Sequence, residues 1–363
     1  MFAQQQRNRR RFFGLAALSL AGAWIGTRDS VQLITMKPFR PSGASDLASL
    51  GRATAWLNSP PLAAADLQGK VVLVDFWTYT CINWLRTVPY VRMWADRYKD
   101  QGLVVIGVHT PEFTFEEDVD NVRRSSKERG VTYPIAIDND RAIWRGFGNH
   151  YWPALFFIDR YGQVRDHHFG EGNYEESETR IREMLATRGS ASGLESRPVS
   201  VEANGPEVGA DWGSLKSPET YVGYHKAENF ASPGGAVLNT RHVYAVPPRL
   251  RLNQWALSGE WTLKTEAASL NAGGGRIAFR FHARDLHLIM GPVARRGAVA
   301  FRVLIDGQPP GAGHGSDVDE RGNGMVTEQR LYQLIRQSGS ITDRLFEIEF
   351  FDFGVEAFAF TFG

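Results

Sequence analysis

The stretch that decides the fold of the first half of this chain is VVLVDFWTYTCINWLRTVPYVRMWADRY, residues 71–98. It opens with an apolar run, Val71–Trp77, that is interrupted by Asp75 and is typical of a strand buried on both faces. From Asn83 to Tyr98 apolar side chains recur at helical spacing. The sequence therefore predicts that Cys81 lies at the junction between a buried strand and a helix.

Strands and helices continue to alternate after this stretch, up to about residue 188. Further strands are predicted at 103–109, 135–138, 154–159 and 164–169, and amphipathic helices at 119–129 and 175–185. Such alternation is typical of an α/β layout. We assign this predicted domain to residues 45–190.

The last part of the chain follows a different pattern. Residues 191–216 are rich in Ser, Gly, Ala and Pro without periodicity, which is typical of a linker. From 217 to 363, short alternating runs are separated by Gly-rich or Asp-rich turns, which predicts an all-β sandwich of the jelly-roll-like kind. Within this region, only Glu328–Arg336 could form a helix.

Length and composition agree with two folded domains. The chain has 363 residues, more than one hydrophobic core usually serves, and its apolar (43%) and charged (22%) contents are near the globular average. A formal net charge of +1, with acidic and basic residues interleaved, supplies no long-range field for nucleic acid. Cys81 is the single cysteine, which excludes an internal disulfide and a Cys-rich metal site. Any cysteine chemistry must therefore involve a partner thiol or disulfide.

Residues 1–29 have the pattern of an export signal. Arginines at 7 and at 9–11 precede an apolar run, Phe12–Ile25, that is short for a membrane span. The segment NRRRFF, residues 8–13, resembles a twin-arginine signal. We therefore expect export to the periplasm or to the outer face of the cytoplasmic membrane. An uncleaved membrane anchor and an ordinary basic helix are the alternatives.

Local physics leaves two interpretations of Cys81 open. At the start of a helix, backbone N–H groups and the helix dipole would stabilise a thiolate and lower the pKa of the thiol. A lone cysteine is at least as often a small buried hydrophobe without reactivity.

Several separated motifs resemble one family. The sequence VDFWTYTC, residues 74–81, is similar to the thioredoxin motif, in which a strand delivers a Cys-x-x-Cys to the next helix. Four further motifs resemble DipZ-like and TlpA-like thioredoxin-family redoxins. These motifs are CINWLRT (81–87), GVHTPEF (107–113), AIW (142–144) and YWPA (151–154). The motifs SPETY (217–221) and DFGV (352–355) resemble the terminal domain of that family, a carbohydrate-binding-module-like β-sandwich. The resemblance spans roughly residues 50–363 and implies a thioredoxin fold followed by an all-β sandwich.

The resemblance also implies roles for five residues. Cys81 corresponds to the nucleophilic thiol, and Trp84 stands where the family has its second, resolving cysteine. Asp75 matches the buried acid that assists proton transfer at the resolving thiol. Pro153, preceded by Trp152, matches the cis-proline loop that faces the active cysteine. Since an indole cannot resolve a mixed disulfide, release of a partner from Cys81 would need an external thiol.

These roles imply an exported thiol-disulfide redox protein with a degenerate Cys-x-x-Trp site. Its expected partners are protein thiols or disulfides, or a small thiol reductant, and we expect no cofactor, no metal and no nucleic acid. Two alternatives stay open. One is a non-catalytic binding module that keeps the fold. The other is a one-cysteine thiol peroxidase, because Thr78–Cys81 has the Thr-x-x-Cys pattern of a peroxiredoxin.

Other candidate groups are weaker. His109 and Glu112 follow a strand and could line the cleft of Cys81, and Asp317–Gly322 with Glu328 partly matches a calcium loop, although a solvated turn is favoured. A glycan or envelope contact through the last domain could use exposed aromatic rings. The candidate rings are Trp212, Tyr221, Tyr224, Trp255 and Trp261.

Overall fold

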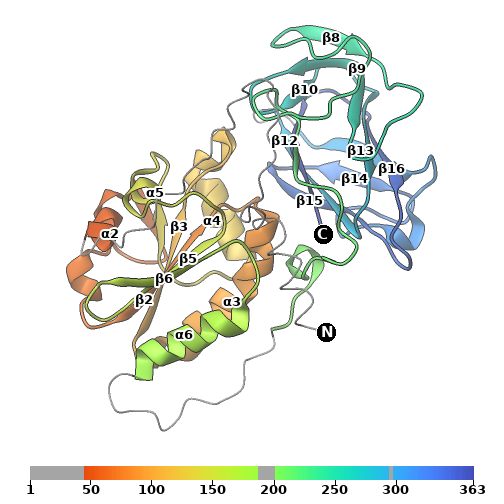
Figure 1. Cartoon of the computed structure of the whole chain (residues 1–363). Coiled ribbons are helices and arrows are strands. Elements are labelled where there is room, and N and C mark those ends of the chain that lie inside the picture. Colours follow the sequence, from red (N-terminus) through yellow and green to blue (C-terminus); the bar gives the residue numbers. More distant parts are fainter. Residues whose placement is uncertain (1–44, 187–200, 294–296) are drawn as a thin grey trace, which may run out of the picture. The chain divides into compact units, whose positions relative to one another are not determined.

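The computed structural model describes residues 45–186, 201–293 and 297–363, which all fall within one compact unit of the chain (Figure 1). The predicted export signal, residues 1–29, lies outside these ranges. Within them, we find no helix with both the length and the apolar character that crossing a lipid bilayer requires.

The first domain is built on a mixed sheet. In the described part of the chain, six strands follow the order β1-β4-β3-β2-β5-β6. The strands are β1 (Ala55–Leu57), β2 (Val71–Trp77), β3 (Leu103–His109), β4 (Ile135–Ile137), β5 (Ala154–Ile158) and β6 (Val164–Phe169). The α-helices are α2 (Ser45–Ala48), α3 (Ile82–Tyr98), α4 (Val119–Glu128), α5 (Ala142–Gly146) and α6 (Tyr174–Ala186). Short 3-10 turns complete the domain at η1 (Ser49–Arg52), η2 (Ala64–Leu67), η3 (Lys99–Gln101) and η4 (Thr114–Glu117).

Strand β2 is central and buried on both faces, as its apolar run predicted. It runs parallel to β3 and antiparallel to β5. Because side chains alternate across a strand, Val72, Val74 and Phe76 join a core cluster with side chains of α2 and α5. Leu73 and Trp77 join a second cluster with side chains of α3 and α6. Figure 1 shows α3 and α6 running beside each other. Because α3 begins five residues after Trp77, the last residue of β2, Cys81 lies in the short connection between the two elements.

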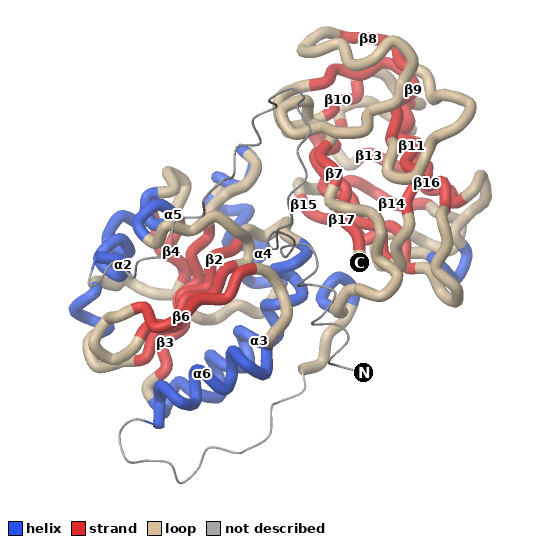
Figure 2. Tube along the Cα trace, in the orientation of Figure 1, coloured by secondary structure: helices blue, strands red, loops and turns tan. Residues whose placement is uncertain are grey.

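The second domain is all-β, as predicted (Figure 2). Eleven strands are described here, and nine of them follow the order β14-β13-β16-β11-β9-β10-β17-β12-β15, with β7 beside β17 and β8 beside β9. The first six are β7 (Thr220–Tyr221), β8 (Arg241–Tyr244), β9 (Trp255–Leu263), β10 (Ala268–Leu270), β11 (Gly275–Phe281) and β12 (Asp285–Pro292). The others are β13 (Val299–Ile305), β14 (Asn323–Val326), β15 (Arg330–Arg336), β16 (Arg344–Phe350) and β17 (Val355–Phe362). Two 3-10 turns, η5 (Gly205–Glu207) and η6 (Gly311–Gly313), are also present.

Strand β9 joins the two layers of this domain. Its first residues, Trp255–Ser258, pair with β11, whereas Gly259–Leu263 pair with β8 or β10. Gly259 has a φ of 89°, and a Cβ there would lie 3.0 Å from the Cα of Gly275. Both constraints favour glycine at the point where the strand passes from one layer to the other. The predicted sandwich is therefore one curled, continuous sheet.

The prediction that Glu328–Arg336 could be helical is wrong. Residues Arg330–Arg336 form β15, which pairs antiparallel with β12. Its central residues are buried on both faces: Tyr332 and Leu334 pack in the core of the second domain, whereas Leu331 packs against the first. A continuous apolar run of this length cannot be distinguished from a buried helix by periodicity alone.

The two domains share a packed seam. Ile289, Leu331, Phe358 and Ala359 from strands of the second domain belong to the same core cluster as α3. The Phe358 ring lies 4.6 Å, centroid to centroid, from that of Phe115. This apolar contact fixes the second domain over the face that carries the start of α3.

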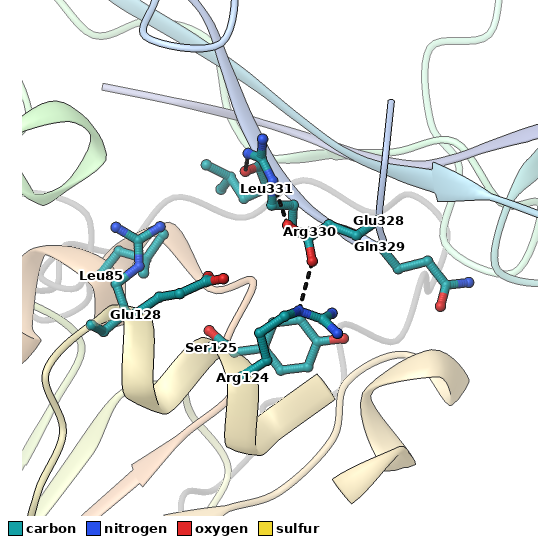
Figure 3. Close-up of a pocket in the computed structure, with 10 residues that line it drawn as sticks. Leu85, Arg124, Ser125, Glu128, Glu328, Gln329, Arg330 and Leu331 are labelled. Carbon is teal, nitrogen blue, oxygen red and sulfur yellow. Dashed lines mark hydrogen bonds and ion pairs between the residues drawn. The ribbon is translucent and has the colours of Figure 1, made fainter. Parts of the chain in front are cut away.

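At the polar edge of this seam, Arg124 of α4 reaches toward the β14–β15 turn (Figure 3). Its Nε lies 2.6 Å from Oε2 of Glu328. The gap that these side chains line, together with Ser125 and Leu331, holds only about 20 Å³, which is room for little more than a water molecule.

Candidate active site

Cys81 occupies the cap position before α3. Its carbonyl accepts a hydrogen bond from the N–H of Leu85 at 3.0 Å, and its own N–H donates to the carbonyl of Thr78 at 3.2 Å. The side chain is half-buried, so the sulfur is neither sealed in the core nor freely exposed.

A cavity of about 410 Å³ opens in front of Cys81. The first domain contributes Cys81, Ile82, Asn83, Arg86, Glu112, His150, Tyr151 and Trp152 to its wall. The segment before the second domain contributes Trp212 and Leu215, and the second domain contributes Ser217, Pro218, Glu219, Tyr221, Lys226, Thr361 and Phe362. The cavity is large enough for a side chain or a small thiol, and both domains are needed to form it.

The start of α3 does not give Cys81 a lowered pKa, because other effects outweigh it. Burial raises the pKa of this thiol well above its ordinary value, and the carboxylates of Glu219 and Glu112 raise it further. Hydrogen bonds from the backbone N–H groups of Trp84 and Asn83 lower the pKa, but their effect is smaller than that of burial and of Glu219. The thiol is therefore mostly protonated at neutral pH.

Trp84 lies one helical turn after Cys81, at the position that the resemblance assigns to a second thiol. Its side chain is fully buried, and its ring stacks on that of Trp77 with centroids 4.2 Å apart and planes 17° apart. Its Nε1 donates a hydrogen bond to Oδ2 of Asp75 over 3.2 Å. The indole thus occupies the space one helical turn after Cys81 and also binds the buried acid.

Asp75 is fully buried on the α3 side of β2. Burial raises its pKa to about 7, although hydrogen bonds from Trp84 and Tyr133 favour the ionised form. Its Oδ1 has no hydrogen-bond partner among the described residues. The acid that the resemblance pairs with a resolving thiol is present, but here it interacts with an indole.

Trp152 and Pro153 form the predicted loop beside the site. The peptide bond between them is cis. Trp152 lines the cavity and its Nε1 donates to the carbonyl of Thr110 at 3.1 Å, whereas Pro153 is buried behind it. The Trp152 ring, rather than the proline ring, is therefore the surface that a partner in the cavity meets.

His109 and Glu112 have separate locations. His109 is fully buried with its ring against those of Trp77 and Tyr79, and burial lowers its pKa to about 3. It does not line the cavity. Glu112 does, and its Oε1 accepts hydrogen bonds from the Tyr221 hydroxyl at 2.5 Å and from Lys226 Nζ at 3.0 Å.

Sequence reasoning missed two charged residues of the cavity, Glu219 and Lys226. Both come from the second domain, more than a hundred residues after Cys81. The one available signal was the motif SPETY, residues 217–221, which the resemblance used only to define a domain.

The carboxylates of the partial calcium loop accept hydrogen bonds from within the protein. Asp317 accepts hydrogen bonds from Arg330 and from the N–H of Gln333, and Asp319 accepts from the N–H groups of Arg321 and Asn323. In the ranges that the structure describes, no cluster of three or more His, Cys, Asp or Glu side chains is arranged to hold a metal ion.

Two of the five candidate sugar-binding rings are excluded. Trp255 and Trp261 are fully buried in the second domain, so neither face is free to stack on a sugar. The Tyr224 hydroxyl is hydrogen-bonded to Asn239 and Thr265. Trp212 and Tyr221 line the cavity in front of Cys81.

Two protein families match consecutive parts of this chain. Residues 53–185 match the Redoxin family, and residues 217–363 match the family described as thioredoxin like C-terminal domain. Neither description mentions carbohydrate binding. A thioredoxin-like protein solved in its oxidized form matches with 32% identity and a TM-score of 0.35, over 37% of this chain and 89% of that one.

Two curated relatives are informative. Protein DipZ of Mycobacterium tuberculosis is 39% identical over 276 residues, which are 74% of this chain and 38% of DipZ. This chain therefore spans well under half the length of that relative. Thiol-disulfide oxidoreductase YkuV of Bacillus subtilis is 32% identical over 132 residues, which are 36% of this chain and 88% of YkuV. With a Redoxin domain followed by a thioredoxin-like C-terminal domain, the chain belongs to the thioredoxin-like family of thiol-disulfide oxidoreductases.

Proposed function

We propose that this protein is a one-thiol redox protein in which Cys81 exchanges with the disulfide of a partner that enters the cavity. One observation carries the proposal: a half-buried Cys81 lies on the wall of a cavity of about 410 Å³, while the residue one helical turn further on is a fully buried tryptophan, Trp84. The site can form a mixed disulfide, but it cannot release it without help.

The reaction is a thiol-disulfide exchange. Cys81 loses its proton to solvent, and its sulfur forms a bond to one sulfur of the partner disulfide while the old S–S bond breaks. The other partner sulfur leaves as a thiolate and takes up a proton. An external thiol then attacks the partner sulfur of the mixed disulfide and regenerates Cys81. The net result is the exchange of one disulfide for another.

The raised pKa of Cys81 sets the pace of both steps. A thiol that is mostly protonated attacks slowly, because only the thiolate is nucleophilic. A thiol with a high pKa is also a poor leaving group, so the external thiol releases it slowly. We therefore expect slow capture, faster at alkaline pH, and a long-lived mixed disulfide.

The same pKa supports a second candidate, a non-catalytic binding module. A thiol kept protonated by burial and by two carboxylates is what an inherited, unused site would contain. The peroxidase alternative has less support. Thr78, the threonine of its pattern, is fully buried, and a peroxidatic cysteine needs to be a thiolate at neutral pH.

We also propose that the protein works outside the cytoplasm, where disulfide partners persist, and that its domains span residues 45–190 and 217–363. The basic and apolar pattern of residues 1–29 supports export. A glycan or envelope contact through the second domain would use Trp212, which is 48% exposed, since Trp255 and Trp261 are buried.

The test is adduct formation with a neutral disulfide, 2-hydroxyethyl disulfide, followed by mass spectrometry of the intact protein between pH 7 and pH 9. We expect one adduct per chain, faster formation at the higher pH, reversal by dithiothreitol and no adduct in Cys81→Ser. If the folded protein forms no adduct at pH 9 while the unfolded protein does, the redox function is wrong and the binding module stands.

A further inference from the structure

The charges around the cavity do not balance. Two carboxylates, Glu112 and Glu219, face it together with one ammonium group, that of Lys226. Arg86 also lines the wall, but its guanidinium lies 3.1 Å from the carboxylate of Glu171. His150 is the other basic side chain on the wall. Burial and Glu112 raise the pKa of Glu219 to about 7. Above that pH, and with Arg86 offset by Glu171, the ionised groups beside Cys81 sum to about one negative charge.

Glu112 accepts hydrogen bonds from the two donors nearest to it, the Tyr221 hydroxyl and Lys226 Nζ. The Tyr221 hydroxyl has one proton to donate, and it lies 2.5 Å from Glu112 Oε1 but 3.3 Å from Glu219 Oε2. Lys226 Nζ also contacts Glu112, at 3.0 Å, while it lies over the Tyr221 ring. Glu219 therefore keeps the weaker share of a single hydrogen bond, and it is the carboxylate with free capacity to accept.

Glu219 is accessible from the cavity. The residue is exposed and lines the cavity, while partial burial of its carboxyl group and the nearby Glu112 raise its pKa. A carboxylate in this position gains from a cation that enters the cavity and pairs with it.

The same cation would act on the thiol. Glu219 and Glu112 both raise the pKa of Cys81. A positive charge placed beside Glu219 reduces that effect and favours the thiolate, so binding and activation are coupled. We propose, as an extension of the proposed function, that the cavity selects disulfides that carry a positive charge next to the reacting sulfur.

A neighbouring cavity extends the same chemistry. It has a volume of about 370 Å³, shares Pro218, Glu219, Tyr221 and Lys226 with the first, and adds Glu228 and Asn229. A partner that spans both cavities would meet a second carboxylate beyond Glu219. This extent fits a polypeptide segment with basic residues beside its cysteine, although a small cationic disulfide has the same charge near the sulfur.

The covalent step is the exchange described above, with the cationic disulfide as the oxidant. The Cys81 sulfur is oxidised as it forms the new S–S bond, and the departing sulfur is reduced to a thiolate that takes up a proton. The cation itself makes no bond and stays in place beside Glu219.

The experiment compares three small disulfides of different charge: cystamine (cationic), 2-hydroxyethyl disulfide (neutral) and dithiodipropionate (anionic). Each rate of adduct formation at Cys81 is divided by the rate of the same disulfide with N-acetylcysteine amide, which corrects for intrinsic reactivity. We expect the corrected rate to be on the order of fivefold higher for cystamine than for the neutral disulfide, and lowest for the anionic one. Salt should reduce these ratios.

Two variants test whether Glu219 causes the preference for the cationic disulfide. Glu219→Gln should bring the cystamine ratio close to one, whereas Glu117→Gln, which removes an exposed carboxylate of the first domain outside the cavity wall, should leave it unchanged. Corrected rates that do not follow charge would overturn the inference and leave the proposed function intact. Failure of all three disulfides to react would overturn the proposed function itself.

A peptide series separates the two sources of the cation. Peptide disulfides with Lys, Ala or Glu on both sides of the cysteine should react in that order. If cystamine shows the preference and the Lys peptide does not, the partner is a small cationic disulfide. If both do, it is a basic polypeptide segment.

Discussion

Trp84 Nε1 and Asp75 Oδ2 are joined by a hydrogen bond of 3.2 Å inside the interface between the central strand and the first long helix. In a dithiol enzyme of this family, the same two positions would hold the resolving thiol and the acid that serves it. Here the indole satisfies one oxygen of the acid and stacks on Trp77. The Trp84 indole is therefore held in place both by ring stacking and by a hydrogen bond.

Restoring the thiol tests whether the rest of the site is competent. Trp84→Cys recreates Cys-x-x-Cys beside Asp75, and we expect it to reduce insulin disulfides in the presence of dithiothreitol faster than the natural chain. Deleting a fully buried indole should also cost about 3–5 kcal/mol of stability. The measurement is insulin turbidity together with denaturant unfolding. Trp84→Ser, which makes a similar cavity without a thiol, is the control, and equal activity in the two variants would contradict the prediction.

Asp75 should make stability depend on pH. Its folded pKa, about 7, lies above the unfolded value, so the native state holds the proton more tightly and stability falls as pH rises from about 4 to about 7. Asp75→Asn removes this titration and can still accept from Trp84. The variant should match the natural protein near pH 4 and exceed it above pH 7 by on the order of 4 kcal/mol. Urea unfolding at several pH values measures the difference, and a pH-independent gap would show that Asp75 is not the titrating group.

Removing the charge of Glu219 should make Cys81 more reactive toward a neutral reagent. Because this carboxylate raises the pKa of the thiol, Glu219→Gln should shift the pH profile of iodoacetamide alkylation toward lower pH and raise the rate severalfold at pH 8. Glu117→Gln should leave the profile where it is. If both variants overlay the natural protein, burial alone sets the pKa.

Phe358 should anchor the second domain to the first. Its side chain is 4% exposed and its ring packs on those of Phe113 and Phe115. We expect Phe358→Ala to cost about 3–5 kcal/mol in denaturant unfolding, and to increase the alkylation rate of Cys81 as the cavity wall loosens. Phe351→Ala, at a residue that is 52% exposed, is the matched control and should change stability by less than about 0.5 kcal/mol.

The elements that carry Cys81 can be predicted from the sequence, because the patterns that indicate them lie in one short stretch of the chain. The apolar run Val71–Trp77 and the helical spacing after Asn83 predict the strand, the helix and the place of Cys81 between them, and the structure confirms all three. Resemblance adds Trp84, Asp75 and the Trp152–Pro153 loop, since these are read position by position along a motif.

Strand β15 shows where local signals fail. The run Leu331–Ile335 is apolar at every position except Gln333, so it has no period that separates a strand from a helix. Only its pairing with β12 and its burial between two cores decide that it is a strand.

By itself, the sequence determined that this protein presents one cysteine at the start of a helix with no second thiol in the chain. Only the tertiary structure decided how that cysteine behaves. Glu112 comes from the loop after β3 and Glu219 from the segment before β7, and the fold brings both to the cavity of Cys81. Electrostatic effects depend on distance in space and on exclusion of water, neither of which a linear pattern records. For that reason the position of Cys81 at the start of a helix favoured a lowered pKa, whereas its surroundings in the folded protein raise the pKa.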